Sequence, residues 1–304
     1  MDRFEAMRTL VAAVDGGSLS AASRALHTPL PTVSRRVSEL EAHLGAQLLV
    51  RTSRKLILTE AGEAFVAVAR RLLDDLGDAE RAAGGEYRAP RGELLVTAPI
   101  MFGKTHVAPI IHDFLDAYPE VTVRLVLADH VIDLVETHVD VALRIGQLPD
   151  SDLVGRRVGQ VHWVICASPF YLARRGEPAS PGELGDHDCI AFEGLQTYRS
   201  WTFGSRTSTQ AAPIRPKFSV NTADAVIDAA SAGVGIARVM SYQAAAAIRF
   251  NKLVSILRNH APPAIPVQLV HRGQRSQPLK QRAFLDFVAP RLKIALDEVE
   301  SLFE

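Results

Sequence analysis

The sequence lacks features that disulfide-rich, membrane-spanning and secreted proteins require. Its 304 residues contain only two cysteines, Cys166 and Cys189, which excludes a disulfide framework and favours a reducing compartment. No apolar run reaches the roughly 20 residues of a membrane-spanning helix. The N-terminal residues Met1–Glu5 carry charges and no hydrophobic signal core. We therefore expect a cytoplasmic protein that does not associate with membranes.

An excess of charge of one sign is also missing. Lys and Arg together number 34, and so do Asp and Glu. Any affinity for nucleic acid must therefore come from local clusters of basic residues and not from the overall charge. Hydrophobic residues make up 47% of the chain, which is sufficient for a globular protein. The length exceeds that of one ordinary hydrophobic core, so at least two domains are expected.

Motifs for catalysis, metal binding and nucleotide binding are scarce. The chain has no Gly-x-Ser-x-Gly elbow and no paired metal-ligand spacing, and its ten histidines are scattered. His187, between two aspartates, is typical of a surface loop, and Cys166, in an apolar run, is typical of core packing. Residues 98–105, APIMFGKT, end like a phosphate-binding loop, but Ala98-Pro99 stands where glycine would let the backbone wrap a phosphate. We expect no enzyme activity, no cofactor and no metal.

Three short helices are predicted in the first 45 residues. Apolar side chains recur at three- and four-residue steps over Phe4–Val14, and Ser18 can cap a second helix. Thr28 is the predicted cap of a third helix, which Gly45 closes. The apolar face of this third helix consists of Val33, Val37, Leu40 and Leu44.

Basic residues concentrate in the third helix and in the segment that follows it. Arg35 and Arg36 lie away from the centre of the apolar face, and residues 47–58 predict a hairpin with a basic tip. Residues 31–58 contain five basic and two acidic side chains. Three helices and a two-stranded wing form a winged helix-turn-helix, whose third helix would enter the major groove of double-stranded DNA. A merely solvated face is the alternative for the arginine pair.

The candidate side chains differ in what they can offer DNA. The Arg35 guanidinium matches the two acceptors of guanine, whereas the other basic residues suit phosphates. Thr32 and Ser34 suit either role or plain helix surface, and Leu30 suits a thymine methyl group. The predicted DNA-binding set is Leu30, Thr32, Ser34, Arg35, Arg36, Arg51, Arg54 and Lys55.

A long helix, capped by Thr59, is predicted to run to about residue 83. Its apolar residues alternate four- and three-residue steps, which is the pattern of a helix pair. We therefore expect this helix to dimerise the chain, and packing against its own chain is the alternative. The predicted seam is Phe65, Ala69, Leu72, Leu76, Ala79 and Ala83. Glycines at 84–85 and the sequence Pro-Arg-Gly at 90–92 predict a domain boundary.

Beyond residue 92, strand-like and helix-like segments alternate. This pattern predicts two α/β lobes with mostly parallel sheets, and the chain returns to the first lobe through residues 265–272 and a last helix over 279–296. Further helices are expected over 104–117, 131–137 and 223–232. Ligands bind in crevices near strand ends and helix N-termini, so a small-molecule effector is expected between the lobes. The candidate effector residues are Pro99, Ile100, Met101, Phe102, Gly103, Ala128, Arg144, Phe203, Asn221 and Thr222.

Two of these assignments have structural alternatives. Arg144 ends an apolar strand and suits an effector carboxylate, but a structural salt bridge fits its position as well. Asn221 and Thr222 precede a predicted helix, so they suit either the cleft or the capping of that helix.

Motifs at fixed spacing make the whole chain resemble the LysR-type transcriptional regulators. In the N-terminal part they are Ser18, Ala21-Ala22, Leu26, Val33-Ser34-Arg35, Leu40-Glu41, Leu44-Gly45, Leu48, Arg51, Arg54 and Leu58–Gly62. In the C-terminal part they are Tyr118-Pro119, Val139–Gly146, Ala167–Pro169, Tyr171-Leu172 and Gly233–Ile236. The resemblance implies a winged helix-turn-helix over 1–59, a linker helix over 60–86 and a two-lobed α/β effector domain over 92–304, similar to periplasmic binding proteins. Lobe I would span about 92–161 and 267–304, and lobe II about 162–266.

The resemblance further implies binding to an imperfect inverted repeat, dimers or tetramers, and RNA polymerase as a partner. It does not decide between activation and repression. Two segments depart from the family pattern: Pro29-Leu30 replaces a frequent Ser-Gln pair, and Pro99–Phe102 lacks the hydroxyl that many relatives carry. We therefore expect a more apolar effector pocket. A small-solute-binding protein and an enzyme acting in the cleft are the alternative functions.

Overall fold

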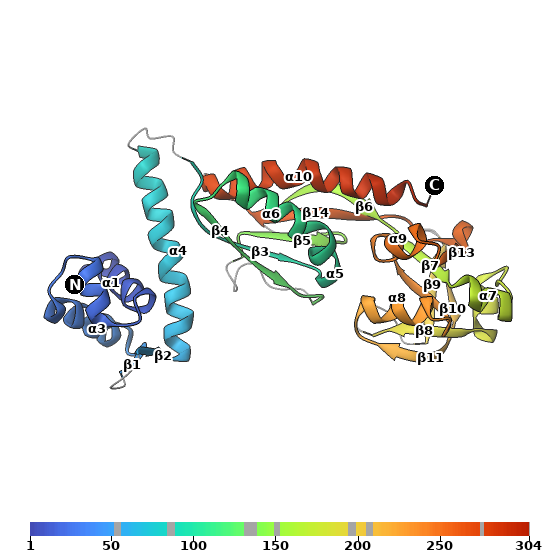
Figure 1. Cartoon of the computed structure of the whole chain (residues 1–304), viewed down its shortest axis with the longest axis horizontal. Helices are drawn as coiled ribbons and strands as arrows, with labels where there is room; N and C mark the ends of the chain where they lie inside the picture. The colour runs from blue at the N-terminus through green and yellow to red at the C-terminus, as the bar shows by residue number, and fades with distance from the viewer. Residues whose placement is uncertain are drawn as a thin grey trace. The chain divides into compact units, whose positions relative to one another are not determined.

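The computed structural model describes residues 1–51, 56–83, 89–130, 139–148, 153–193, 199–204, 209–273 and 277–303. Two compact units, Met1–Gly92 and Glu93–Glu304, make up the chain (Figure 1). The predicted helix over 131–137, the basic tip with Arg54 and Lys55, and the side chain of Arg51 lie outside the described part.

The first unit consists of helices and one small hairpin. Its elements are α1 (Arg3–Asp15), α2 (Leu19–Ala25), α3 (Leu30–Leu44), β1 (Leu49–Arg51), β2 (Leu56–Leu58) and α4 (Glu60–Ala83). Strands β1 and β2 pair antiparallel, as the predicted wing requires. Ser18 caps α2 by accepting the N–H of Ala21, and Gly45 ends α3 in the left-handed conformation, so both predicted helix ends are confirmed.

Two predictions for α3 were wrong. Pro29 is its N-cap and forms no side-chain bond, while the Thr28 hydroxyl donates to the carbonyl of Leu26. Proline at this position moves the start of the helix beyond the reach of Thr28. Leu44 is 40% exposed because it lies at the C-terminal end of α3, beyond the packed core formed with Val37 and Leu40.

Helix α4 begins in close contact with the wing. The Thr59 hydroxyl accepts the N–H of Gly62 and donates to the carbonyl of Gln47, so it caps the helix as predicted. A Cβ atom on Gly62 would lie 2.0 Å from the carbonyl oxygen of Leu48. Glycine therefore permits the close approach of helix and wing.

The second unit contains two five-stranded sheets, one in each lobe. The lobe I sheet has the order β4-β3-β5-β14-β6, and the lobe II sheet has the order β11-β8-β12-β7-β13. Lobe I is built from β3 (Gly92–Ala98), β4 (Val121–Leu127), β5 (Val141–Ile145), β6 (Leu153–Val161) and β14 (Ile265–Arg272), with helices α5 (Ile100–Phe102), α6 (Ala108–Ala117) and α10 (Leu279–Glu300). A π-helical turn, Gly103–Val107, joins α5 to α6, so this helical stretch begins before the predicted residue 104.

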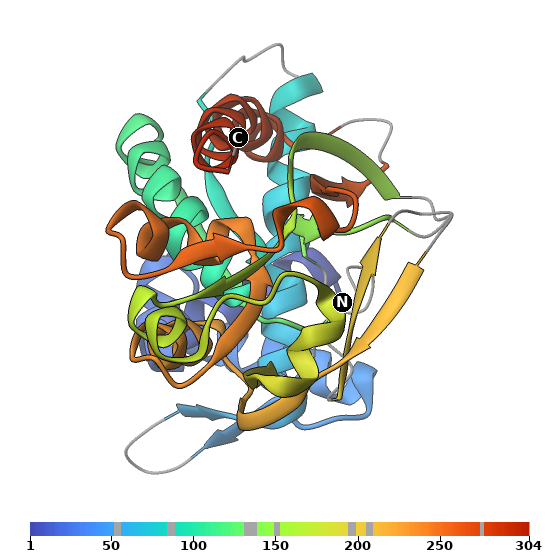
Figure 2. The same ribbon diagram turned by 90° about the vertical axis from the view of Figure 1, so that its right-hand side faces the viewer.

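Lobe II adds a two-stranded ribbon to its sheet. Its strands are β7 (Trp163–Ala167), β8 (Asp188–Phe192), β11 (Arg215–Val220), β12 (Ile236–Met240) and β13 (Val254–Ile256). Its helices are α7 (Pro169–Arg175), α8 (Ala223–Ser231) and α9 (Ser241–Arg249), with short 3-10 turns at Pro181–Asp186 and Arg258–His260. Strands β9 (Ser200–Gly204) and β10 (Thr209–Pro213) pair as a separate ribbon (Figure 2).

Both large sheets are mixed, which corrects the prediction of mostly parallel sheets. Strand β14 pairs antiparallel with β5 and β6, and β7 pairs antiparallel with β12 and β13. The physical reason is the path of the chain: β6 leads from lobe I to lobe II and β14 returns, so the crossing strands run in opposite directions.

The burial of Cys166 and His187 tests the predictions made for these two residues. Cys166 is fully buried, which confirms core packing, and burial raises the pKa of its thiol to about 12. His187 is buried as well, with Nδ1 3.1 Å from the Tyr171 hydroxyl, so the expected surface loop was wrong. This hydrogen bond explains how a polar ring between two aspartates can be buried.

The described residues hold no group of three His, Cys, Asp or Glu side chains suited to a metal ion. No helix in the described part of the chain has both the length and the apolar character that crossing a bilayer requires.

Candidate nucleic-acid interface and effector site

Helix α3 presents Arg35 to solvent. Val33 and Val37 are fully buried, which fixes the inner face of the helix. The Arg35 side chain is 70% exposed, and its Nε lies 3.8 Å from Oε1 of Glu39. Exposed ion pairs of this kind contribute little free energy, about 0 to 1 kcal/mol. Arg35 can therefore exchange Glu39 for a nucleobase at small cost.

Arg36 forms an ion pair within the first unit. Its side chain is 29% exposed, and Nη1 lies 3.0 Å from Oε2 of Glu5 on α1. The pair connects α3 to α1, so a phosphate at Arg36 would compete with a carboxylate that is already bound. Of the other predicted contacts on α3, Leu30 is exposed, whereas Thr32 and Ser34 are half-buried, and Ser34 takes part in a polar interaction within the chain.

Glu41 connects α3 to the wing, a role that the sequence did not reveal. Its Oε1 accepts the backbone N–H groups of Leu48 and Leu49, at 2.8 and 3.0 Å. A single carboxylate thereby satisfies two donors just before β1 and fixes where the wing begins. The sequence alone did not reveal this role, because the partners of Glu41 are brought to it by the fold.

The predicted dimerisation seam of α4 divides into two parts. Ala69 is fully buried and Phe65 packs against the core of the first unit. This corrects the assignment of Ala69: it faces its own chain, because the first half of α4 covers α1. Leu72 is 41% exposed and Leu76 is half-buried, so they remain candidates. The side chains of Ala79 and Ala83 lie outside the described part.

Lobes I and II meet where α5 and the π-helical turn contact α9. Met101 packs against the cores of both lobes. The Phe102 ring meets the Tyr242 ring edge-on, with centroids 5.0 Å apart, and His106 lies 4.9 Å from Phe102. Burial lowers the pKa of His106. Tyr242 and His106 were not predicted, because the contact joins segments far apart in the sequence.

The start of α5 already has a carboxylate partner. The N–H of Ile100 donates to Oδ1 of Asp129 at 3.0 Å. Burial raises the pKa of Tyr242, and the negative charge of Asp129 adds to the increase. Asp129 therefore places negative charge beside the lobe junction, at the helix start that the sequence assigns to the effector site.

Polar side chains also approach the junction from lobe II. Nζ of Lys104 and Oδ1 of Asp224, from opposite lobes, are 4.0 Å apart. Asn221 and Thr222 are exposed at the start of α8. Thr222 occupies the N-cap position without a side-chain hydrogen bond, so the alternative in which it caps α8 through its hydroxyl is not realised.

Several predicted effector residues belong to the packed interior. Phe203 is buried with Trp201 between the sheet of lobe II and the β9–β10 ribbon, so its assignment to the effector site was wrong. Its cluster is separate from the one that contains Val226 of α8 and Ala244 of α9. The interior of lobe I likewise contains Phe102, Gly103 and Ala128.

The remaining candidates retain some exposed surface. Pro99 and Met101 are half-buried, and Ile100 is exposed. Arg144 is half-buried, burial lowers its pKa, and it takes part in a polar or electrostatic interaction within the chain.

Family models match both units of the chain. Residues 4–63 match the bacterial regulatory helix-turn-helix protein, lysR family, and residues 88–293 match the LysR substrate binding domain. An HTH-type transcriptional regulator of Xanthomonas campestris pv. campestris is 35% identical over 291 residues, which are 94% of this chain and 85% of that protein.

Solved structures agree with these matches. The structure of CrgA, a LysR-type transcriptional regulator from Neisseria meningitidis, shares 31% identity and a TM-score of 0.61, covering 95% of this chain and 98% of that chain. The full-length Vibrio cholerae virulence activator AphB shares 29% identity and a TM-score of 0.60, covering 93% and 97%. The chain therefore belongs to the LysR family and is a DNA-binding transcriptional regulator with a C-terminal effector-binding domain.

Proposed function

We propose that two copies of the chain bind an imperfect inverted repeat in double-stranded DNA. Each copy places α3 in the major groove of one half-site. The supporting observation is Arg35: it is mostly exposed on α3, and its weak pairing with Glu39 leaves the guanidinium able to bind guanine. Arg51, Arg54 and Lys55 contact phosphates beside it.

A small molecule at the lobe junction shifts the relative placement of the two DNA-binding units. Ile100, Met101, Asn221 and Thr222 are the candidate contacts, since these side chains are exposed or half-buried at the facing ends of the two lobes. The protein acts in the cytoplasm without a cofactor or an enzymatic step. Dimers pair into tetramers on DNA, where RNA polymerase is the further partner.

A footprint on the DNA upstream of the protein's own gene tests the proposal. Arg35→Ala is expected to weaken binding to the protected site by about 10- to 100-fold, because one bidentate guanine contact is lost. Binding to random duplex should change far less. Titration of both duplexes at fixed salt measures the ratio of their dissociation constants.

Arg8→Ala is the matched control, since Arg8 is an exposed arginine of the same unit and lies outside α3. The control should bind like the wild type. Equal affinity and selectivity of Arg35→Ala and Arg8→Ala would show that Arg35 does not read the DNA sequence.

A further inference from the structure

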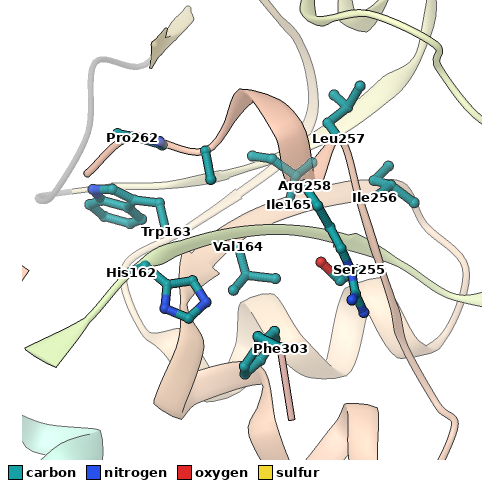
Figure 3. Close-up of a pocket in the computed structure, with 11 residues that line it drawn as sticks. His162, Trp163, Val164, Ile165, Ser255, Ile256, Leu257, Arg258, Pro262 and Phe303 are labelled. Carbon is teal, nitrogen blue, oxygen red and sulfur yellow. The ribbon is translucent and has the colours of Figure 1, made fainter. Parts of the chain in front are cut away.

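The recess at the edge of the lobe II sheet shows no sign of a missing partner. It has a volume of about 160 Å³, and its lining includes His162, Trp163 and Phe303 (Figure 3). Within the described part of the chain, no polar side-chain atom that lines it is both buried and without a hydrogen-bond partner. The first unit, by contrast, contains buried backbone groups whose partner is the side chain of another element.

These backbone groups belong to the segment that joins α3 to the wing. The segment passes through the core of the first unit, where Leu48 and Leu49 are each 1% exposed. Buried backbone N–H groups need an acceptor, which the main chain supplies in helices and sheets. Here a side chain supplies it: Oε1 of Glu41 accepts both N–H groups, at 2.8 and 3.0 Å.

The start of α4 holds the same segment through neutral groups. The carbonyl of Leu48 accepts the N–H of Thr59 at 3.0 Å, and the carbonyl of Gln47 accepts the Thr59 hydroxyl at 2.6 Å. Hydrogen bonds to a carboxylate are about twice as strong as those between neutral groups. Glu41 therefore makes the stronger attachment of this segment.

Glu41 lies away from the face of α3 that carries Arg35. It follows Arg35 by six residues, which places it about 120° around the helix. It also follows the buried Leu40, and its own side chain is half-buried. The charge of Glu41 is unfavourable in a DNA-binding unit, because phosphates repel a carboxylate. Any benefit to DNA binding must therefore come from the position that Glu41 gives to the wing.

We propose that Glu41 is a positioning residue for DNA binding, which holds the wing where its basic residues reach the phosphates beside the half-site. The inference rests on the proposed function, in which Arg51, Arg54 and Lys55 contact phosphates. Without the carboxylate, two buried N–H groups lose their acceptor, and the segment must move to bind water. The wing moves with it, because Leu49 is the first residue of β1.

The salt dependence of operator binding tests this role. The slope of log K against log salt concentration reports the number of phosphate contacts, at about 0.9 per contact. Glu41→Ala is expected to reduce the magnitude of this slope by about 1 to 3 per copy and to weaken binding about ten-fold or more near 0.1 M salt. Selectivity for the operator over random duplex should change far less, because Arg35 still contacts its base. Loss of a negative charge alone would have the opposite effect, tighter binding.

Two further variants separate positioning from charge and from folding. Glu41→Gln keeps an acceptor oxygen at the same place and should retain most of the slope. Glu63→Ala is the matched control, since it removes an exposed carboxylate from α4 of the same unit, and it should keep the wild-type slope. Stoichiometric titration measures the active fraction of each protein. A merely structural role for Glu41 would lower this fraction and leave the slope of the active molecules unchanged, which would overturn the proposal.

A variant of the wing tip distinguishes failure of this proposal from failure of the proposed function. Arg54→Ala combined with Lys55→Ala removes two phosphate contacts directly and should lower the slope by about 2 per copy. If it does so while Glu41→Ala keeps the slope of Glu63→Ala, the positioning role is overturned and the phosphate contacts stand. If neither the wing-tip variant nor Glu41→Ala changes the slope, both proposals are wrong. Tighter binding by Glu41→Ala than by the wild type would also overturn the positioning role.

Discussion

The adjacent arginines of α3 differ in exposure, and this difference separates their roles. Successive helix residues point about 100° apart, so Arg36 reaches back to Glu5 while Arg35 faces solvent. A phosphate would have to replace the 3.0 Å contact between Arg36 and Glu5. Arg36 therefore serves mainly to position α3 on α1, and Arg35 is the better candidate for reading bases.

The burial of His106 makes the stability of the protein depend on pH. Its ring packs against both Phe102 and Tyr242, and burial lowers its pKa below the ordinary value of 6.5. Below that pH the unfolded chain binds the proton more readily than the folded chain does. The free energy of unfolding therefore falls as the pH drops below about 6.5, and His162 acts in the same direction.

Replacing the His106 imidazole with a phenyl ring removes its contribution to the pH dependence of the free energy of unfolding. Between pH 7.5 and 5.5, His106→Phe is expected to lose less stability than the wild type, by at most about 1.4 kcal/mol per pH unit. Urea unfolding at both pH values measures the difference. His112→Gln is the matched control, because it changes an exposed histidine of α6 that lies outside the contact with Phe102 and Tyr242. Identical slopes for His106→Phe and the wild type would contradict the assignment.

At the scale of elements, the junction of α4 with the wing depends on Gly62. Replacing this glycine with alanine would stabilise the helix by about 1 kcal/mol, because alanine has the higher helix propensity. It also places Cβ 2.0 Å from the carbonyl oxygen of Leu48, a backbone atom that cannot rotate away. Forcing an atom into such a contact costs about 1 to 3 kcal/mol or more, so the clash outweighs the propensity.

Gly62→Ala should therefore destabilise the first unit by about 1 to 3 kcal/mol and weaken DNA binding by displacing the wing. Thermal unfolding and the operator titration measure the two effects. Gly182→Ala is the control, because its Cβ would lie 3.8 Å from Oγ of Ser180, an ordinary contact. An unchanged melting temperature for Gly62→Ala would show that wing and helix can separate freely.

The elements found from the sequence share a strong local pattern. Helix α3 has a buried apolar face, and strands such as β7 and β12 are short apolar runs between breakers. Strand β6 was missed because its residues 154–157 are exposed and include a glycine, so no alternation marks it. Thr28 was a plausible cap by type, but Pro29 decided where α3 begins. Local patterns therefore predicted the elements that have one buried face.

At the scale of the whole molecule, the sequence could not reveal which side chains meet. Phe102 meets Tyr242 across the lobe junction, and Ile100 binds Asp129 within lobe I. Both contacts depend on the complete topology. Phe203 was assigned to the effector site because it is aromatic and near a strand, yet the β9–β10 ribbon buries it elsewhere. The family resemblance supplied the two-lobed architecture. The resemblance could not predict features that are particular to this sequence, such as the carboxylate of Asp129 at the start of α5.

The proposed pairing of two copies would use the surface that α4 leaves exposed. The first half of α4 is covered by α1, but Leu72 presents a large apolar side chain to solvent. In a symmetric dimer one substitution acts twice. Leu72→Glu removes about 1.5 to 3 kcal/mol of apolar burial per copy and should therefore raise the dimer dissociation constant by about 100-fold or more.

Sedimentation velocity over a concentration series measures this change, and the operator titration should show a parallel loss, since a monomer can occupy only one half-site. Ala67→Glu is the matched control: Ala67 is exposed on α4 but lies about 140° around the helix from Leu72. It should leave the dimer intact. If Leu72→Glu remains as dimeric as Ala67→Glu, the chain pairs through another surface, and the spacing between the two copies of α3 is set elsewhere.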